Sequence, residues 1–532
     1  MAAALTALAP VATRYAPNGM VCAVDHLAAV AASAVLAVTS QHMCGMGGDL
    51  FALVHTGSAP PTALNASGRA GSGADPARLR AEGHQRMPAH GDIRSVPVPG
   101  CVDGWLALHG RFGRLPLADV LAPAWSYAEE GFPATATLAA SVQRLGGLAG
   151  AEDYTAAGPL HPGDIVRRPG VARALAAIAS EGRSGFYGGE FGEALVALGG
   201  GEYTDDDLAR NQAEWVEALS VRAWGHDLWT TPPNSQGYLT LSSAWIAERV
   251  DLPGDPTDPA WAHLTVEAAR QAGHDRLAVL HEHADGASLL APERLEPRRL
   301  AIDPDGAAPL GDEYDEGGTI YLCAVDRERM GVSLIQSNAQ GFGSLLVVPG
   351  VRIFLQNRGI GFSLVEGHPA EYGPGRRPPH TLSPALVTRP DGSLRLVVGT
   401  MGGDSQPQVL LQLLARTLAT HQSPGAAVPG REPAAGDTWR AAGRWALASP
   451  AGPPGVTGSG FSTWDGGGRV QVLVEGHAPA TWDDGLEKRG HAVRRTEAYG
   501  HGFGHAHAIA VDDTRLAGAS DPRSRAGAEA GF

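Results

Sequence analysis

Thr319 constrains the fold of this chain more than any other residue, because it stands where a predicted loop meets a predicted strand pair. Residues 311–318 (GDEYDEGG) are acidic and end in two glycines. Residues 319–326 (TIYLCAVD) and 332–337 (VSLIQS) are apolar runs separated by a short turn. Two such runs predict a β-hairpin. We therefore expect Thr319 to open a strand directly after a loop.

A threonine at such a junction can serve as a nucleophile once the bond before it is cut. Cleavage of Gly318–Thr319 would give Thr319 both a hydroxyl group and a free α-amine. An α-amine titrates near pH ~8, so it can take the hydroxyl proton without a separate base. A self-cleaving N-terminal nucleophile hydrolase requires this arrangement. It predicts a large fragment, residues 1–318, and a small fragment, residues 319–532, within one structural domain.

Further motifs follow one another along nearly the whole chain. They are residues 43–51 (MCGMGGDLF), 96–100 (VPVPG), 230–237 (TTPPNSQG), 341–344 (GFGS), 399–404 (GTMGGD) and 518–523 (GASDPR). In this order they resemble the γ-glutamyltranspeptidase (glutathione hydrolase) family. The resemblance implies an α+β fold, the four-layer αββα sandwich of N-terminal nucleophile hydrolases. The strand and helix pattern alone predicts only a mixture of α and β.

The resemblance also implies a catalytic set. Thr319 would be the nucleophile, and Ser337 would be a second hydroxyl that hydrogen-bonds it. Gly402 and Gly403 would supply backbone N–H groups to the oxyanion, since glycines place no side chain in the way. The implied enzyme is a γ-glutamyltransferase-like threonine amidohydrolase. Its acyl-enzyme is resolved by water or an amine acceptor, without a metal or organic cofactor.

The sequence departs from the family where the glutamyl group is normally held. Ser67 occupies the position of the family's carboxylate-binding arginine, and Arg69 lies two residues later. Gly361 replaces the acid that binds the α-amino group, and Arg358 adds positive charge nearby. His380 and Thr381 replace paired serines. The predicted substrate-binding residues are Arg69, Arg358, His380, Thr381 and Asp404, although the three basic ones also fit a solvated surface cluster.

These departures leave three functions open. The first is a γ-glutamyltransferase or glutathione hydrolase. The second is an amidohydrolase for another anionic acyl group, such as oxamate or a dicarboxylic acyl amide. The third is an unprocessed, non-enzymatic homologue, which is favoured by the apparent loss of a family segment between Leu27 and Val30.

Composition narrows the choice of partners. The net charge of -15 argues against nucleic acid or an anionic membrane as a ligand. The four cysteines form no CxxC pair, so neither a zinc site nor a disulfide framework is predicted. The N-terminus lacks a basic region, which predicts a cytoplasmic protein although many family members are exported. The two fragments are expected to stay associated, and a higher oligomer is left open.

Secondary structure can be predicted for several segments outside the site. Residues 117–130 and 259–283 have helical patterns, and Thr204 precedes three aspartates as a helix N-cap. Residues 290–318 are rich in proline and glycine, which predicts a long loop leading to the cleavage site.

Overall fold

The computed structural model describes most of the chain. The described residues are 14–16, 20–23, 29–57, 60–310, 318–419, 443–448, 470–512, 514–519, 521–523 and 528–531. Residues 311–317, which carry the acidic segment before Thr319, lie outside this set, as do residues 24–28, next to which the loss of a family segment was predicted.

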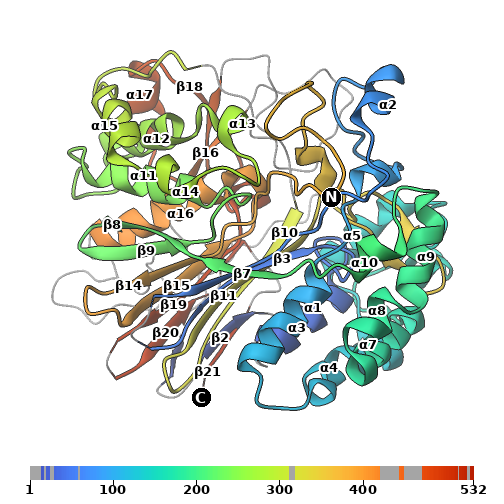
Figure 1. The fold of residues 1–532 in the computed structure, drawn as a ribbon. Coiled ribbons are helices and arrows are strands. Elements are labelled where there is room, and N and C mark those ends of the chain that lie inside the picture. The colour runs from blue at the N-terminus through green and yellow to red at the C-terminus, as the bar shows by residue number, and fades with distance from the viewer. Residues whose placement is uncertain are drawn as a thin grey trace, which may run out of the picture.

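Two seven-stranded sheets form the centre of the fold (Figure 1). The first sheet has the order β21 (Ala528–Gly531), β2 (Met20–Ala23), β10 (Gly318–Val325), β11 (Gly331–Ala339), β3 (Asp49–His55), β4 (Thr62–Ala66) and β7 (Glu214–Glu217). The second has the order β1 (Arg14–Ala16), β20 (Leu516–Ala519), β19 (Ala506–Val511), β15 (Leu394–Thr400), β14 (Ala385–Thr388), β9 (His226–Thr230) and β8 (Leu219–Ala223). Both sheets therefore contain strands from each side of the Gly318–Thr319 bond.

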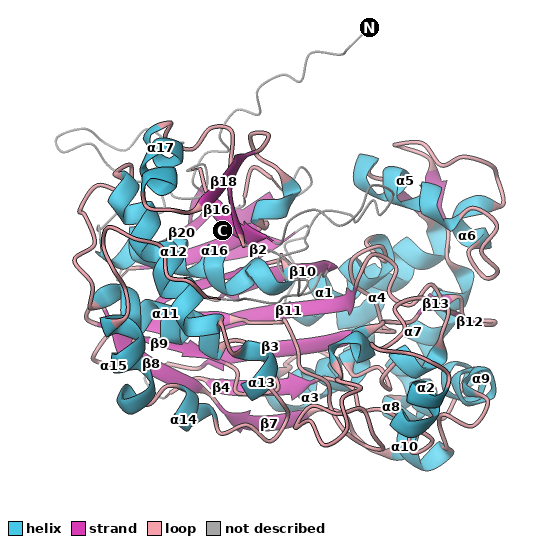
Figure 2. Cartoon of the chain, turned by 90° about the horizontal axis from the view of Figure 1, so that it is seen from above, coloured by secondary structure: helices cyan, strands magenta, loops and turns pink. Residues whose placement is uncertain are grey.

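Helices cover the outer face of each sheet, as Figures 1 and 2 show. Helices α1 (Ala29–Thr39) and α3 (Cys101–Phe112) pack against the first sheet, α4 (Leu117–Glu130) packs on α1, and α7 (Pro169–Glu181) packs on α4. Helices α11 (Tyr238–Glu248) and α16 (Gln406–Leu414) pack against the second sheet, and α12 (Pro259–Gly273) packs on both of them. A third apolar cluster fills the space between the sheets and takes side chains from both, among them Phe51, Tyr321, Ile335, Leu386, Val397 and Ile509.

Strand β3 illustrates why the sequence forms this arrangement. All seven of its residues are buried. Leu50, Ala52 and Val54 face the helices, whereas Phe51 and Leu53 face the second sheet. A strand covered on both faces favours apolar residues along its length, which explains the continuous run LFALV at residues 50–54. The structure confirms the predicted four-layer αββα sandwich of the α+β class.

Shorter elements complete the chain. The helices are α2 (Pro76–Ala81), α5 (Ala136–Val142), α6 (Glu152–Thr155), α8 (Arg183–Tyr187), α9 (Glu190–Gly199), α10 (Asp205–Ala209), α13 (Arg276–Val279), α14 (Gly286–Leu289), α15 (Pro292–Leu300) and α17 (Thr481–Lys488). The strands are β5 (Phe132–Pro133), β6 (Ile165–Val166), β12 (Val347–Val348), β13 (Ile353–Phe354), β16 (Trp445–Ala448), β17 (Gln471–Val474) and β18 (Ala492–Arg495). In the parts of the chain that the structure describes, no helix is both long and apolar enough to cross a membrane.

Among the predicted helices and loops, some are confirmed and others are wrong in their bounds. The helix over residues 117–130 is α4, and Thr204 caps α10 in a reciprocal capping box with Asp207. The helix predicted over 259–283 ends at Gly273, and α13 follows as a separate turn. The loop predicted over 290–318 was wrong at its start, because residues 292–300 form α15. Pro292 takes a first-turn position where no N–H is needed, and the buried Leu295 anchors the helix.

Candidate active site

Thr319, Ser337, Asp49 and Ser67 lie side by side at one end of the first sheet. Ser337 on β11 pairs with Asp49 on β3, and Leu50 pairs with Ala66, which places Ser67 beside Asp49. The register between β10 and β11 shifts by one residue around Thr319. This bulge sets two residues of β11, Ser337 and Asn338, opposite Thr319. Bulges of this kind re-aim side chains next to active sites.

Thr319 is fully buried at the start of β10 and is hydrogen-bonded to the second hydroxyl. Its Oγ1 lies 3.3 Å from Ser337 Oγ. Ser337 Oγ also accepts from the Ala339 N–H at 2.8 Å and from Arg358 Nη2 at 3.3 Å. The Ser337 hydroxyl, which contacts Thr319, is therefore surrounded by an N–H donor and a positively charged side chain. This environment favours negative charge developing on Thr319 Oγ1. The structure brings together Thr319, Ser337 and Arg358, as the sequence predicted.

Arg358 reaches the nucleophile from the short 3-10 helix η3 (Arg358–Gly361). Its side chain is buried, and Nη1 donates to Thr381 Oγ1 at 3.1 Å. The preceding Asn357 anchors the helix, since its Nδ2 donates to the Ala89 carbonyl and its Oδ1 accepts from the Gln340 N–H. The guanidinium therefore lies in a fixed place inside the site and does not belong to a surface cluster. Thr381 joins the same contact network.

The glycine pair follows β15 directly, in the 3-10 helix η4 (Gly403–Ser405) and the residue before it. Gly402 and Gly403 have φ angles of +140° and +53°, which disfavour residues with a Cβ atom. A Cβ atom on Gly399 would come within 2.1 Å of Tyr321, so the end of β15 runs against the start of β10. Gln236 Nε2 donates to the carbonyls of Thr381 and Gly403, at 3.0 Å each. The glycine turn is therefore tied to the segment that holds Arg358.

Within the described residues, neither the Gly402 nor the Gly403 N–H hydrogen-bonds to another protein group. The turn follows β15, which lies against β10, the strand that carries Thr319. Two free backbone donors at such a turn can bind an oxyanion. The turn itself is held by Ser405, whose Oγ and N–H both donate to the Gly402 carbonyl, at 2.7 and 2.9 Å.

Gly402→Ala is expected to lower kcat by about 10²–10³-fold with a smaller change in KM, because a displaced oxyanion donor weakens binding mainly in the transition state. A Cβ atom at this φ is strained and would lie 2.6 Å from Ser405 Oγ. Steady-state kinetics on the mature enzyme would measure this. Gly392→Ala, at a distant turn with φ of +83°, is the matched control for strain alone. Equal losses in the two variants would contradict the assignment.

His380 lies within the site, and protein groups bind both of its ring nitrogens. Its Nδ1 accepts from the Leu382 N–H and its Nε2 donates to Asp49 Oδ2, both at 3.2 Å, and the ring is fully buried. Burial, with Arg358 nearby, lowers the pKa of His380 to about 3. The ring is therefore neutral near pH 7 and contributes no positive charge. These contacts fix the ring of His380 next to Thr381, and its contact with a substrate stays a prediction.

Buried neutral histidines predict acid sensitivity. Burial lowers the pKa of His42 and His507 to about 4, in addition to the effect on His380. Their ordinary pKa is 6.5, so between about pH 6.5 and 4 the unfolded chain binds more protons than the native one. The free energy of unfolding should then fall as pH decreases through this window, by up to about 1.4 kcal/mol per pH unit for each group. Melting temperatures at pH 7.5, 6 and 5 would test this, and a flat profile would contradict it.

Arg69 and Asp404 are held by other protein groups. Arg69 Nη2 pairs with Glu214 at 2.5 Å, and Glu214 also binds Arg377 at 2.8 Å. No described contact links Arg69 to Thr319 or Arg358, so its substrate role stays a prediction. Asp404 is buried and pairs with Arg276 of α13 at 3.1 Å. This ion pair positions the turn that begins at Gly402.

Several supporting residues were not assigned from the sequence. Asp49 and Gln236 belong to quoted motifs, residues 43–51 and 230–237, but nothing in those motifs indicated which partners they bind. Arg276 carried no sequence signal, because its partner lies more than a hundred residues away. The described residues contain no group of three or more His, Cys, Asp or Glu side chains placed to hold a metal ion.

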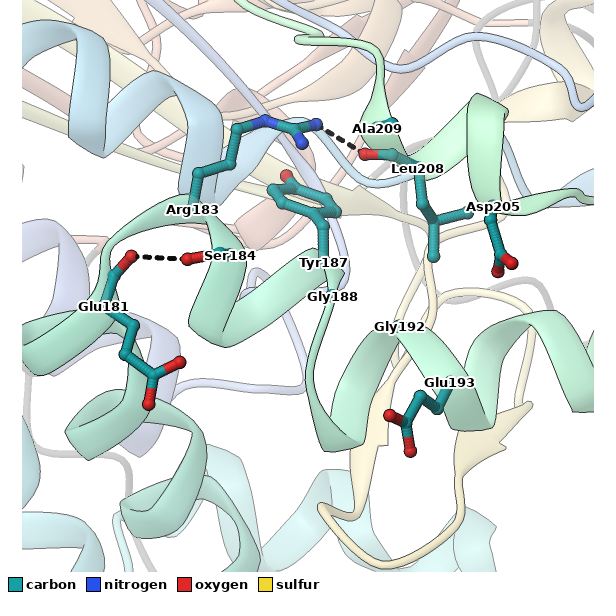
Figure 3. Close-up of a pocket in the computed structure, with 10 residues that line it drawn as sticks. All are labelled: Glu181, Arg183, Ser184, Tyr187, Gly188, Gly192, Glu193, Asp205, Leu208 and Ala209. Carbon is teal, nitrogen blue, oxygen red and sulfur yellow. Dashed lines mark hydrogen bonds between the residues drawn. The ribbon is translucent and has the colours of Figure 1, made fainter.

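A cavity lies apart from these residues. Residues of α8, α9 and α10 and the end of α7 line this cavity, among them Glu181, Arg183, Tyr187 and Glu193 (Figure 3). Its volume is about 750 Å³. Arg183 is already bound to the Leu208 carbonyl at 2.6 Å and to Asp103 at 2.9 Å. None of the residues around Thr319 lines this cavity, so we assign it no part in the chemistry.

Comparison with known proteins identifies relatives that match nearly the whole chain. The family model described as Gamma-glutamyltranspeptidase matches residues 22–531. The chain is 34% identical over 527 residues to the oxamate amidohydrolase proenzyme of Klebsiella pneumoniae, covering 95% of this chain and 93% of that protein. It is 33% identical over 519 residues to the glutathione hydrolase-like YwrD proenzyme of Bacillus subtilis, covering 93% and 92%. A crystal structure of cephalosporin acylase from Bacillus halodurans superposes with a TM-score of 0.85 at 30% identity, covering 100% of this chain and 99% of that one.

Proposed function

The chain belongs to the gamma-glutamyltranspeptidase family, and we propose that it is a self-processing amidohydrolase for a small anionic acyl group that lacks an α-ammonium. In this account the proenzyme cleaves itself at Gly318–Thr319. Thr319 Oγ1 then attacks the amide carbonyl, and its own α-amine takes the proton. The N–H groups of Gly402 and Gly403 bind the oxyanion, and the amine leaves with the returned proton. Water or an acceptor amine then attacks the acyl-enzyme.

The observation that carries this proposal is the position of Arg358. Contacts of 3.3 Å join its Nη2 to Ser337 Oγ and Ser337 Oγ to Thr319 Oγ1, so the cation lies within two hydrogen-bond lengths of the nucleophile. A substrate carboxylate close to the reacting carbonyl would find a charge-assisted partner there. Gly361 offers no acidic group for an α-ammonium. An oxamate-like substrate has this pattern of charge, and one relative is named as an oxamate amidohydrolase.

The strand order supports continued association of the two fragments after cleavage. Strand β10 of the small fragment is inserted between β2 of the large fragment and β11, and β14 pairs with β9. Separation would break hydrogen bonds in both sheets and expose the apolar layer between them. We therefore propose a stable complex of residues 1–318 and 319–532. A cytoplasmic location remains a prediction that cell fractionation can test.

Hydrolysis of γ-glutamyl amides is the second candidate, since one relative is named glutathione hydrolase-like and the family model matches residues 22–531. A matched pair of chromogenic anilides separates the two. The γ-glutamyl and glutaryl anilides differ only in the α-ammonium group. We expect the glutaryl anilide to be the better of the two, and oxamate to be hydrolysed to oxalate and ammonia much faster than acetamide is hydrolysed. Much faster hydrolysis of the γ-glutamyl anilide would reverse the choice.

A further inference from the structure

Helix α12 carries three polar side chains on one face, in the large fragment and away from Thr319. His263, Glu267 and Arg270 are spaced at i, i+4 and i+7, which aligns them along the helix. All three are buried, with 0%, 0% and 6% of their surface exposed. Buried ionisable groups are costly unless their hydrogen bonds are satisfied. We call these three residues the α12 track.

The partners of the α12 track are backbone groups of residues 303–310, the segment that leads to the cleavage site. His263 Nε2 donates to the Asp303 carbonyl at 2.8 Å. Glu267 Oε2 accepts from the Ala308 N–H at 3.0 Å. Arg270 Nη2 donates to the carbonyls of Ala308 and Leu310, at 3.0 and 3.4 Å. The contacts advance along the segment in the same order as along the helix.

Residues of the small fragment also bind residues 303–310. The Arg489 carbonyl accepts from the Ala307 N–H at 2.7 Å, and Arg489 Nε donates to the Pro304 carbonyl at 2.9 Å. His491 Nε2 lies 2.8 Å from His263 Nδ1. Within the track, Arg270 Nη1 pairs with Glu267 Oε1 at 2.7 Å. Departure of the segment would deprive buried charges of their backbone partners, so it should stay bound after cleavage as well as before.

We infer that the α12 track is a docking site for residues 303–310, which holds the chain so that Gly318–Thr319 reaches its cleavage geometry. The inference rests on the proposed cleavage at that bond. Seventeen residues separate Leu300, the end of α15, from Gly318, and only seven separate Leu310 from Gly318. Loop-closure probability falls with about the 3/2 power of loop length, so complete release back to α15 would lower the productive population about fourfold. Glu267 and Arg270 act as positioning residues for maturation and have no part in substrate turnover.

The test is the double variant Glu267→Gln with Arg270→Met in the full-length chain. Conversion of precursor to fragments would be followed by gel after a pulse of cell-free synthesis. We expect cleavage to slow by about two- to fourfold, while kcat/KM of the fully matured enzyme stays within twofold of wild type. Arg299→Met is the matched control, because Arg299 binds Glu296 on α15 and does not contact residues 303–310.

Two outcomes would overturn the inference: cleavage at the wild-type rate, or a loss of mature kcat/KM equal to the loss in cleavage rate. If the double variant does not fold, Arg489→Gln replaces it, because this half-buried side chain contacts the same segment at Pro304. An unchanged cleavage rate there would equally overturn docking. A wild-type chain that never cleaves would instead contradict the proposed function, so the two failures can be told apart.

Discussion

Thr319→Ala should leave the protein as a single uncut chain of 55.0 kDa and abolish amide hydrolysis. Both reactions need the same hydroxyl, first against the Gly318 carbonyl and then against the substrate. The hydroxyl is buried, and it is bonded to Ser337, which Arg358 and the Ala339 N–H also contact. Loss of a covalent nucleophile removes about 10⁴-fold or more of the rate. Intact mass spectrometry and a hydrolysis assay of the purified variant would measure both effects.

Thr319→Ser is the matched control, because it keeps the hydroxyl and changes only a methyl group. It should still cleave and turn over, more slowly than wild type, since serine is less restricted at χ1 than threonine. Cleavage in the alanine variant, or hydrolysis by its uncut chain, would rule out Thr319 as the nucleophile. An uncut wild type would favour the non-enzymatic alternative.

Arg358→Met should lower kcat/KM for an oxamate-like amide by about 10- to 100-fold. Charge-assisted hydrogen bonds to a buried cation contribute about 1.5–3 kcal/mol, and this one would be lost in the transition state. Methionine fills similar space without charge. The loss should be specific: a neutral acyl amide, which has no carboxylate to bind, should be hydrolysed at a rate closer to wild type. The measurement is kcat/KM for an oxalyl anilide and for an acetyl anilide with the same leaving group.

Arg173→Met serves as the control for loss of an arginine, because Arg173 is an exposed partner of Glu190. It should leave both substrates unaffected. A fall of equal size for the charged and neutral substrates would mean that Arg358 only orients Ser337 and Thr381. The proposed recognition of a carboxylate by Arg358 would then be wrong, but the assignment of Thr319 as the nucleophile would be unaffected.

The sequence predicted the framework of the site well, for physical reasons that can be named. The strand β10, its partner β11 and the turn at Gly402 are local patterns: alternating burial on two faces, a short connection and glycines at positive φ. Each of these is encoded within about ten residues. The same holds for α4 and for the cap of α10. The bulge opposite Thr319 was not foreseeable, because it arises from the register between two strands.

Side-chain roles were harder to predict because they depend on long-range partners. His380 was expected to add positive charge, but Asp49, over three hundred residues earlier, uses its Nε2 and burial keeps it neutral. Arg69 pairs with Glu214, a partner that the sequence did not indicate, and its substrate role stays a prediction. Helix α15 was missed since prolines in isolation indicate a break, whereas Asp275 binds both Arg294 and Arg298 and stabilises the helix from outside.

The most direct test of the central claim is to trap the acyl group on the wild-type enzyme. The protein would be mixed with an oxalyl anilide, quenched in acid within the first turnover, digested and analysed by mass spectrometry. We predict a small fragment whose first residue is Thr319, with the oxalyl group on that terminal residue. A mature N-terminus at another residue, or an acyl group on Ser337 instead of Thr319, would contradict the account.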